Sequence, residues 1–447
     1  MNQEHQQYSK ENFIDSSPTL TEQYLSDHFA INPWVLTQVR NAEDQIRAQF
    51  LKLDDIMALN QYKVLDAFQK NRISDMHFAW QTGYGYNDPG REALEKVYAD
   101  IFCTEAALVR PTIVNGTHAL TLTFAGILRP GDELIYCTGK PYDTLEEVIG
   151  IRGENKGSLK DFGISYQQVE LLPDGGIDFN VLKSTITPKT KMISLQRATG
   201  YGWRKAITIT QIQEWTAFVK KINPDIICMV DNCYGEFLDT VEPTQLGVDV
   251  MAGSLIKNPG GGLALTGGYI VGRQDLIDLV SYRMTSPGIG GECGLTFGQT
   301  RNMFQGLFIA PKTVNGAVKG AVLCSQVFSN LGYLVCPDPS ANRSDIIQAI
   351  QLGTPEAVIA FCKGIQAAAP IDAHVDPLPW DMPGYEDQVI MAAGSFVQGS
   401  SIELSADAPI RPPYNVYFQG GLTYEHSKFG VIRALQELFH NGHIHNL

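Results

Sequence analysis

The hydrophobic positions between residues 106 and 272 alternate between short apolar runs and longer amphipathic stretches. Short runs bounded by turn residues are typical of buried strands, whereas apolar residues that recur every three or four positions indicate helices. The runs that predict strands lie at residues 106–110, 131–136, 191–196, 226–230 and 267–272. An alternation of strands and helices predicts a mostly parallel sheet covered by helices on both faces.

Two helices in this region have recognisable start signals. Thr210 and Gln213 form the pattern of a capping box, and the apolar stripe that follows consists of Ile212, Trp215, Phe218, Val219 and Ile222. The other helix, residues 119–128, follows the segment Asn115-Gly116-Thr117-His118. We expect the apolar stripe to belong to the core of the domain.

The flanking regions predict two further units. Apolar positions indicate helix in an N-terminal segment, residues 1–75, and they are Val35, Val39, Ile46, Phe50 and Leu53. A long helix at 311–331 is expected to leave the large domain, residues 76–310, and to begin a smaller α+β domain, residues 311–447. The expected elements of that domain are strands at 346–352, 389–396 and 401–405, helices at 355–368 and 429–439, and a Pro-rich loop at 372–384.

Composition narrows the possible partners. The chain has 447 residues, of which 44% are hydrophobic and 18% charged, and its formal net charge is −14. The negative charge argues against nucleic acid or an anionic membrane as partner. No apolar run reaches membrane-spanning length, and residues 1–18 are typical neither of a signal peptide nor of a transit peptide. We therefore expect a cytoplasmic protein.

Neither the cysteines nor the histidines predict a metal site. The eight cysteines include no Cys-x-x-Cys pair, which argues against a zinc ribbon and against a disulfide framework. His440, His443 and His445 stand near the C-terminus, where a frayed tail is more common than a metal centre. No metal ligand is therefore predicted.

Two charged residues follow apolar runs and point to a cofactor. Residues 226–230 lead to Asp231, and a second short run leads to Lys257, directly before the turn Asn258-Pro259-Gly260-Gly261-Gly262. Alone, each would more often be a turn, cap or surface residue. Together, at successive strand ends, they suit pyridoxal phosphate (PLP): a lysine binds it as a Schiff base, and an aspartate keeps its pyridine nitrogen protonated.

The segments around these residues resemble a known family. Asp231-Asn232-Cys233-Tyr234-Gly235-Glu236 and the stretch from Ser254 to Gly262 are similar to the aluminium-resistance protein family, as are Gly83 to Arg91 and Asn115 to Ala119. That family is a branch of the fold-type-I PLP-dependent enzymes related to cystathionine and methionine lyases. The resemblance implies a fold-type-I PLP-dependent transferase-like structure: α/β, with a mostly parallel central sheet in the large domain and a smaller α+β C-terminal domain.

A phosphate site is expected at the start of the second helix. Gly116 and Thr117 offer backbone N–H groups, a hydroxyl and the positive end of a helix dipole, which suit a phosphate dianion; a plain N-cap is the alternative. The resemblance adds Ser254, which matches a phosphate-binding serine of the lyases. His118 could contact the cofactor, donate a proton or lie in the core.

The resemblance also implies residues around the cofactor ring. Tyr142 matches the aromatic residue that covers the pyridine ring in the lyases, and stacking of this kind is physically favourable. Tyr234 stands where many fold-type-I enzymes place a tyrosine near the ring hydroxyl. Asn258 departs from the family pattern, because the lyases usually have an aromatic residue directly after the lysine.

Other residues are expected at the edge of the site. Tyr84, Tyr86 and Arg91 resemble a loop that reaches the cofactor phosphate of a neighbouring subunit, which implies a homodimer or homotetramer with shared active sites. Arg411 is the candidate to bind the α-carboxylate of a substrate, for which a planar guanidinium is well suited; a surface arginine is the equal alternative. The glycine-rich segment 286–294 is expected near the site or at a subunit contact.

The resemblance points to cleavage of a carbon–sulfur bond by β- or γ-elimination from a sulfur-containing amino acid, with Lys257 as general base and with Asp231 and Tyr142 beside the ring. Residues that hold PLP do not decide which bond breaks. An aminotransferase or aldolase is therefore the nearest alternative. A PLP-binding homeostasis protein without turnover is the alternative from another class.

Overall fold

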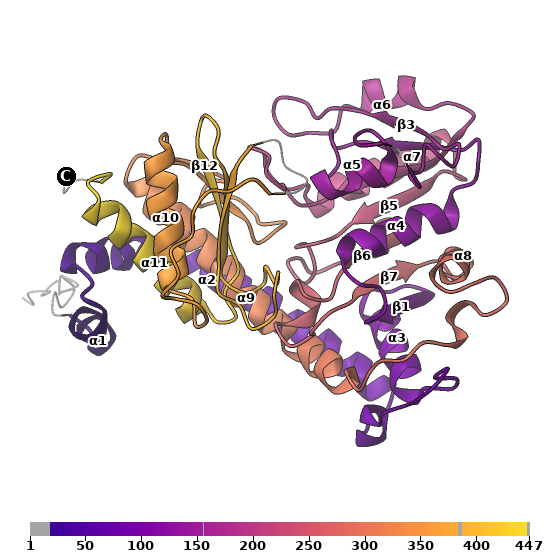
Figure 1. Cartoon of the computed structure of the whole chain (residues 1–447), viewed down its shortest axis with the longest axis horizontal. Coiled ribbons are helices and arrows are strands. Elements are labelled where there is room, and N and C mark those ends of the chain that lie inside the picture. Colours follow the sequence, from indigo (N-terminus) through magenta and orange to yellow (C-terminus); the bar gives the residue numbers. More distant parts are fainter. Residues whose placement is uncertain (1–17, 155, 383–386, 445–447) are drawn as a thin grey trace, which may run out of the picture.

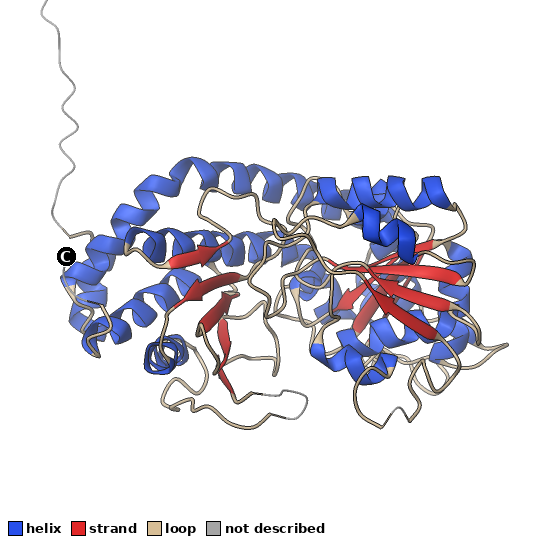
Figure 2. Ribbon diagram, turned by 90° about the horizontal axis from the view of Figure 1, so that it is seen from above, coloured by secondary structure: helices blue, strands red, loops and turns tan. Residues whose placement is uncertain are grey.

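The computed structural model describes residues 18–444, apart from 155 and 383–386. Two sheets lie side by side, and two long helices run past both of them (Figures 1 and 2). The larger sheet is mostly parallel and the smaller one is antiparallel, which confirms the predicted fold class. Within the described residues, no helix combines the length and the apolar character that crossing a membrane requires.

The larger sheet has the strand order β1-β7-β6-β5-β4-β2-β3. Its strands are β1 (Ala106–Arg110), β2 (Glu133–Tyr136), β3 (Ser165–Gln168), β4 (Thr190–Gln196), β5 (Ile227–Asp231), β6 (Val250–Ser254) and β7 (Gly268–Gly272). Strand β7 is antiparallel to both of its neighbours, and the pairs from β6 to β3 are parallel. The carboxyl ends of β4, β5 and β6 therefore meet at one edge of the sheet, where α/β proteins bind ligands.

Helices cover both faces of this sheet, and the side chains of strand β5 are buried on both faces. Ile227 and Met229 belong to one apolar cluster, whereas Cys228 and Val230 belong to the other, as expected for a strand buried on both sides. The covering helices are α3 (Pro89–Ile101), α4 (Gly116–Ile127), α5 (Asp143–Ile149), α6 (Phe179–Thr185), α7 (Ile209–Ile222) and α8 (Gln274–Met284). Four short 3₁₀ turns complete this part: η1 (Asp75–Phe78), η2 (Pro243–Leu246), η3 (Asn258–Gly260) and η4 (Gly290–Glu292).

The predicted capping box of α7 is wrong by two residues. The N-cap is Thr208, whose hydroxyl accepts from the N–H of Gln211 at 3.2 Å, and the side chain of Gln211 accepts from the N–H of Thr208 at 2.9 Å. Thr210 lies inside the helix. Both pairs have the same spacing, so the spacing alone did not separate them.

The long helices join the two halves. Helix α1 (Leu20–Phe29) is followed by α2 (Pro33–Lys70), which packs along α9 (Thr300–Asn330) (Figure 2). Asp54 of α2 accepts hydrogen bonds from Asn315 at 2.8 Å and from Lys319 at 2.6 Å. Helix α9 begins earlier than the predicted residue 311, because Met303, Phe304 and Leu307 are buried in the core of the large sheet.

The smaller sheet has the order β10-β11-β12-β9-β8. Its elements are β8 (Leu334–Cys336), β9 (Gln348–Gln351), α10 (Pro355–Ala367), β10 (Val389–Ala393), β11 (Ser405–Pro409), β12 (Asn415–Gln419) and α11 (Tyr424–His440). The strand predicted at 401–405 is wrong, since β11 begins at Ser405. The Glu403 carboxylate accepts from the N–H groups of Phe396 and Val397 at 2.8 and 2.9 Å, which holds the preceding residues in a loop.

Candidate active site

A cavity of about 200 Å³ lies at the carboxyl edge of the larger sheet. The ends of β4, β5 and β6 and the start of α4 border it. Predicted site residues that line it are Gly116, Thr117, Tyr142, Asp231, Tyr234, Ser254 and Lys257. The topology of the sheet thus brings together most of the residues that were selected from separate segments of the sequence.

Lys257 follows β6 and reaches over the ring of Tyr234, with its Nζ 4.0 Å from the ring centroid. Burial alone would lower the pKa of Lys257, but the acidic groups of Cys233, Tyr234 and Asp231 outweigh burial and raise that pKa. Tyr234 has a φ of +72°, an unusual backbone conformation for a non-glycine residue.

Asp231 ends β5 and is almost completely buried. Burial raises the pKa of Asp231, while Lys257 and a hydrogen bond from the N–H of Cys233 to Oδ1 at 3.1 Å act in the opposite direction. The Cys233 thiol also lines the cavity, and burial raises its pKa, so it is not a ready nucleophile. The carboxylate of Asp231 is thus placed to accept from an N–H group inside the cavity.

The start of α4 forms a small polar cradle. Asn115 caps the helix by accepting from the N–H of His118 at 2.8 Å, and the hydroxyls of Thr117 and Thr144 are 2.8 Å apart. A Cβ atom on Gly116 would come within 3.3 Å of Ser254 Cβ and 3.5 Å of Cys233 Sγ. The missing side chain of Gly116 therefore leaves room at a helix N-terminus, where anions bind favourably.

A second cavity, of about 360 Å³, shares Tyr142, Gln196 and Gly200 with the first. Arg411 lines this second cavity, with Nη1 3.0 Å from Asp387 Oδ2, and about half of its side chain is exposed. The structure thus places Arg411 at the outer side of the site and Tyr142 between the two cavities.

His118 does not line either cavity, so the structure does not support its predicted role at the cofactor. Its Nδ1 lies 3.1 Å from the N–H of Val114, and burial lowers the pKa of its imidazole. A neutral ring in this position accepts the Val114 hydrogen bond and secures the segment before α4. His118 is therefore part of the local scaffold.

Arg91 is also placed differently from the prediction. Only 2% of it is exposed, and its guanidinium donates to the main-chain oxygens of Gly85, Gly294 and Glu292. These bonds join the loop before α3 to the predicted glycine-rich segment 286–294, and they hold Arg91 inside its own subunit. Arg91 therefore cannot reach the phosphate of a neighbouring subunit without losing them.

The two tyrosines of the same loop face outward. Tyr84 is 73% exposed and Tyr86 is 52% exposed, and their ring centroids are 5.5 Å apart. Neither lines the cavity of its own chain. The segment 286–294 lies against this loop, since the N–H of Gly294 donates to the oxygen of Tyr84 at 2.9 Å.

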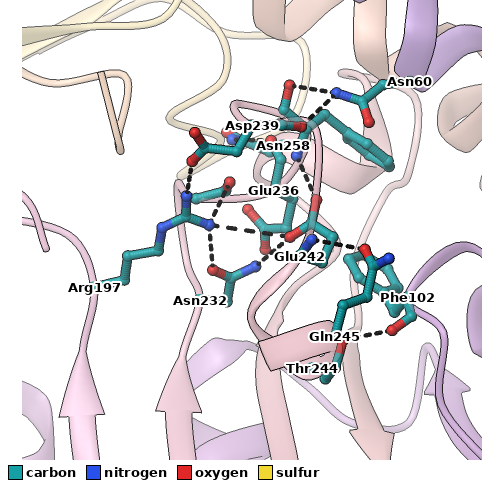
Figure 3. A network of polar contacts seen from close by, with 12 residues as sticks. Asn60, Phe102, Arg197, Asn232, Glu236, Asp239, Glu242, Thr244, Gln245 and Asn258 are labelled. Atoms are coloured by element: carbon teal, nitrogen blue, oxygen red, sulfur yellow. Dashed lines mark hydrogen bonds and ion pairs between the residues drawn. The ribbon is translucent and has the colours of Figure 1, made fainter. Parts of the chain in front are cut away.

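A buried polar network supports the turn after β5 (Figure 3). Arg197 donates to Asn232 Oδ1 at 2.9 Å, to the oxygen of Gly235 at 2.8 Å and to Asp239 at 2.5 Å. Asn232 in turn donates to Glu242 at 3.3 Å. A Cβ on Gly235 would fall 2.6 Å from Arg197 Cδ. The shape of this turn thus depends on polar contacts that the sequence motif did not reveal.

Sequence reasoning also missed cavity residues from the end of β4. Gln196, Ala198 and Gly200 line the first cavity. Their position at the carboxyl end of a parallel strand was the available signal. Within the described residues, no group of three or more His, Cys, Asp or Glu side chains is arranged to hold a metal ion; His445 lies outside that part of the chain.

The family model described as methionine gamma-lyase matches residues 35–439. The chain belongs to the methionine gamma-lyase family. Members of this family are PLP-dependent lyases whose substrates are amino acids, that is, small molecules. The predicted resemblance is therefore confirmed.

The chain is also similar to solved structures and to other relatives. A crystal structure of a carbon–sulfur lyase involved in aluminium resistance from Clostridium novyi is 51% identical, covers 95% of this chain and 100% of that chain, and has a TM-score of 0.91. An uncharacterized protein of Bacillus subtilis is 54% identical over 388 residues, which are 87% of this chain and 92% of the relative. A cystathionine gamma-lyase from Lactobacillus plantarum, 17% identical with a TM-score of 0.55 over 81% of this chain and 92% of that chain, shares the fold.

The cavity of this methionine gamma-lyase family member suits PLP by the chemistry of its residues. The cradle at Gly116 and Thr117 provides N–H and hydroxyl donors for a phosphate group, and a Cβ at Gly116 would fill it. Asp231 offers a buried carboxylate, and Lys257 offers an amine in the same cavity. These are the three kinds of partner that PLP requires.

Proposed function

We propose that this chain is a PLP-dependent carbon–sulfur lyase that acts by β- or γ-elimination on a sulfur-containing amino acid. The observation that carries the proposal is the meeting of Lys257, Asp231 and the N-terminus of α4 in one cavity. The match between the chain and the methionine gamma-lyase family model supports a lyase reaction.

In this proposal each residue has a defined task. Lys257 holds the cofactor through Nζ, and Asp231 accepts a hydrogen bond from the pyridine N–H. Gly116, Thr117 and Ser254 receive the phosphate, and Tyr142 covers the ring. When bound, PLP supplies an electron sink for the electron pair released at the substrate Cα.

Lys257 also moves the proton. A lysine amine of this kind would serve as the general base that takes the proton from the substrate Cα. The ring of Tyr234, 4.0 Å from Nζ, restricts where the amine can lie. The hydroxyl of Tyr234 accepts from Ser401 of the smaller domain at 2.8 Å, so the ring itself is held in place.

The second cavity suggests the character of the substrate. Its wall includes Arg204 and Arg411 as cations and Glu170 and Asp387 as anions. A purely apolar thioether arm would desolvate such groups without compensation, which is unfavourable. We infer a substrate in which the second group on the sulfur atom is polar or charged. Arg411 binds a carboxylate of this substrate through its planar guanidinium group.

The experiment is a product assay on the purified protein with added PLP. Amino acids with a charged second arm on sulfur, with a methyl on sulfur and without sulfur are compared, and 2-oxo acid, thiol and ammonia are measured. The proposal predicts the three products in equal amounts, from substrates with a charged arm above all, and none from the Lys257→Ala variant. A 2-oxo acid without thiol and ammonia would indicate transamination, and no product from any amino acid would favour a PLP-binding protein without turnover.

A further inference from the structure

Asn258, the residue directly after Lys257, has a specific buried contact. Its side chain is fully buried, and its Nδ2 donates to the main-chain oxygen of Glu236 at 3.1 Å (Figure 3). Glu236 belongs to the turn after β5, and Asn258 belongs to the turn after β6. The bond therefore joins the turns that follow β5 and β6.

Glu236 is itself anchored on a third strand. Its Oε1 accepts from the hydroxyl of Tyr269 of β7 at 2.6 Å. The ring of Tyr269 lies so close to β6 that a Cβ on Gly253 would be 2.6 Å from it, and it stacks on Phe102 with the planes 8° apart. A side chain held on both sides in this way fixes the position of the Glu236 carboxyl group.

The backbone after Asn258 is also closely packed. A Cβ on Gly260 would lie 1.7 Å from the oxygen of Leu255, and a Cβ on Gly261 would lie 2.3 Å from the oxygen of Gly306 of α9. The turn is thus packed against its own start and against a long helix. The hydrogen bond from Asn258 to Glu236 and the packing of this turn together restrict the backbone at Lys257.

We propose that Asn258 is a positioning residue for Lys257, and that the hydrogen bonds from Tyr269 to Glu236 and from Asn258 to Glu236 fix where the lysine amine meets the cofactor. The inference rests on the proposed PLP site. It also gives a reason for an asparagine where the related lyases usually have an aromatic residue. A lysine that is held in place before the cofactor binds loses less conformational entropy on binding, and this strengthens binding.

The charge state of Glu236 agrees with a positioning role. Burial raises the pKa of Glu236 to about 8, and the Tyr269 hydrogen bond acts in the opposite direction. At neutral pH the carboxyl group of Glu236 therefore holds its proton. The titratable groups that face Glu236 from the elements around it are Tyr98 of α3, Cys233 after β5, Glu242 before η2, Lys257 after β6 and Tyr269 of β7.

The chain provides a matched control for Asn258. Asn60 of α2 is also buried, and its Nδ2 donates to the oxygens of Phe237 and Asp239 at 3.1 and 3.0 Å, in the same turn after β5 (Figure 3). Asn60 is not attached to the segment of Lys257. Removing Asn258 takes the donor from one carbonyl group of this turn, and removing Asn60 takes the donor from two, so the control loses at least as many hydrogen bonds.

The experiment compares Asn258→Ala with Asn60→Ala by three measurements: Tm, the Kd for PLP, and the acylation rate of Lys257 in the cofactor-free protein, read by peptide mass spectrometry. Both variants should lower Tm by about 1–3 °C. Asn258→Ala should raise the Kd about tenfold or more and should change the acylation rate at least about threefold. Asn60→Ala should leave both within about twofold.

Equal changes in the two variants, or a wild-type Kd and acylation rate in Asn258→Ala, would overturn the inference. If Asn258→Ala does not fold, Tyr269→Phe, which removes only the hydroxyl that holds Glu236, should show the same two changes at smaller size, and its failure to do so would count equally against the proposal. A wild-type protein that binds no PLP would refute the proposed function, while the acylation rates would still decide the role of Asn258.

Discussion

At the scale of single residues, the site depends on a buried acid whose charge the fold disfavours. Burial raises the pKa of Asp231, and the nearby Lys257 acts in the opposite direction. An acid whose pKa is raised on folding does not stabilise the protein in its charged form. A charged Asp231 in the cavity therefore requires a partner there, which in our proposal is the pyridine N–H of PLP.

We predict that Asp231→Asn folds and binds some cofactor but turns over slowly. The substitution keeps the shape and removes the charge, and a hydrogen bond to a charged group is worth about 1.5–3 kcal/mol, which corresponds to a loss of roughly 10- to 100-fold in kcat. Tm of the cofactor-free variant should stay within about 3 °C of wild type. Near-wild-type kcat in steady-state assays would show that Asp231 is not the partner of the ring.

The order and spacing of the apolar runs could predict that Lys257 and Asp231 lie near each other, because both residues follow runs that were expected to form neighbouring strands, and both line the same cavity. The same pattern could not place Arg91 or His118, because the role of such a side chain depends on the partners that the fold provides. Arg91 found three main-chain oxygens in its own subunit, and His118 found the N–H of Val114. Glu236 and Arg197 were not selected at all, since buried network residues have no sequence signature beyond their polarity.

At the scale of elements, the start of α4 is the part of the site with the clearest architecture. Its N-cap, Asn115, bonds the N–H of His118, which leaves the earlier N–H groups available beside Ser254. The position of α4 follows from β1, whose end delivers the chain to the carboxyl edge of the sheet. A phosphate group would meet there both the N–H donors and the dipole of the helix.

Gly116→Ala should weaken PLP binding without unfolding the helix. The added Cβ would come within 3.3 Å of Ser254 Cβ, so it fills the space that we assign to the phosphate. We expect the Kd for PLP to rise by about tenfold and the Tm of the cofactor-free protein to change by less than about 3 °C. Titration with PLP at constant protein concentration measures the first quantity, and an unchanged Kd would contradict the phosphate assignment.

The elements of the large sheet could largely be predicted, because strands buried on both faces read as continuous apolar runs. Short elements escaped: β3 is exposed at the sheet edge, and α5 and α6 have seven residues each. The capping box of α7 shifted because two Thr-x-x-Gln patterns overlap, and the hydrogen bonds form at the earlier one. In the smaller sheet, the loop fixed by Glu403 displaced β11 from its predicted start.

At the scale of the whole molecule, buried acids outside the cavity set the pH range of stability. Burial raises the pKa of Asp407, in β11, to about 7, with hydrogen bonds from Tyr201 and Gln419 acting in the opposite direction. The folded state therefore keeps a proton that the unfolded state loses near pH 3.8, the ordinary pKa of an aspartate side chain. Stability from this group is complete below that pH and is lost as pH rises through about 7.

Asp407→Asn should remove this contribution. We predict that the free energy of unfolding of wild type falls between about pH 4 and pH 7 by an amount on the order of a few kcal/mol more than that of the variant. Denaturant unfolding at a series of pH values measures the difference. Parallel pH profiles for the two proteins would show that Asp407 ionises normally in the fold.

The outward-facing Tyr84 and Tyr86 bear on assembly. Because Arg91 is held inside its own subunit, the tyrosines remain the residues of that loop that could enter the cavity of a second copy. If sites are shared, mixing the inactive variants Lys257→Ala and Tyr84→Ala should restore up to about one quarter of the activity, since half of the dimers are mixed and each has one complete site. No recovery despite proven subunit exchange would contradict sharing.

The central claim is that Lys257 holds PLP in the cavity at the carboxyl edge of the sheet. Its most direct test is reduction of the PLP-loaded protein with borohydride, followed by peptide mapping. We predict one pyridoxyl group per chain, on the peptide that contains Lys257, and no label in Lys257→Ala. A pyridoxyl group on a different lysine, or a wild-type protein that takes no label, would contradict this claim.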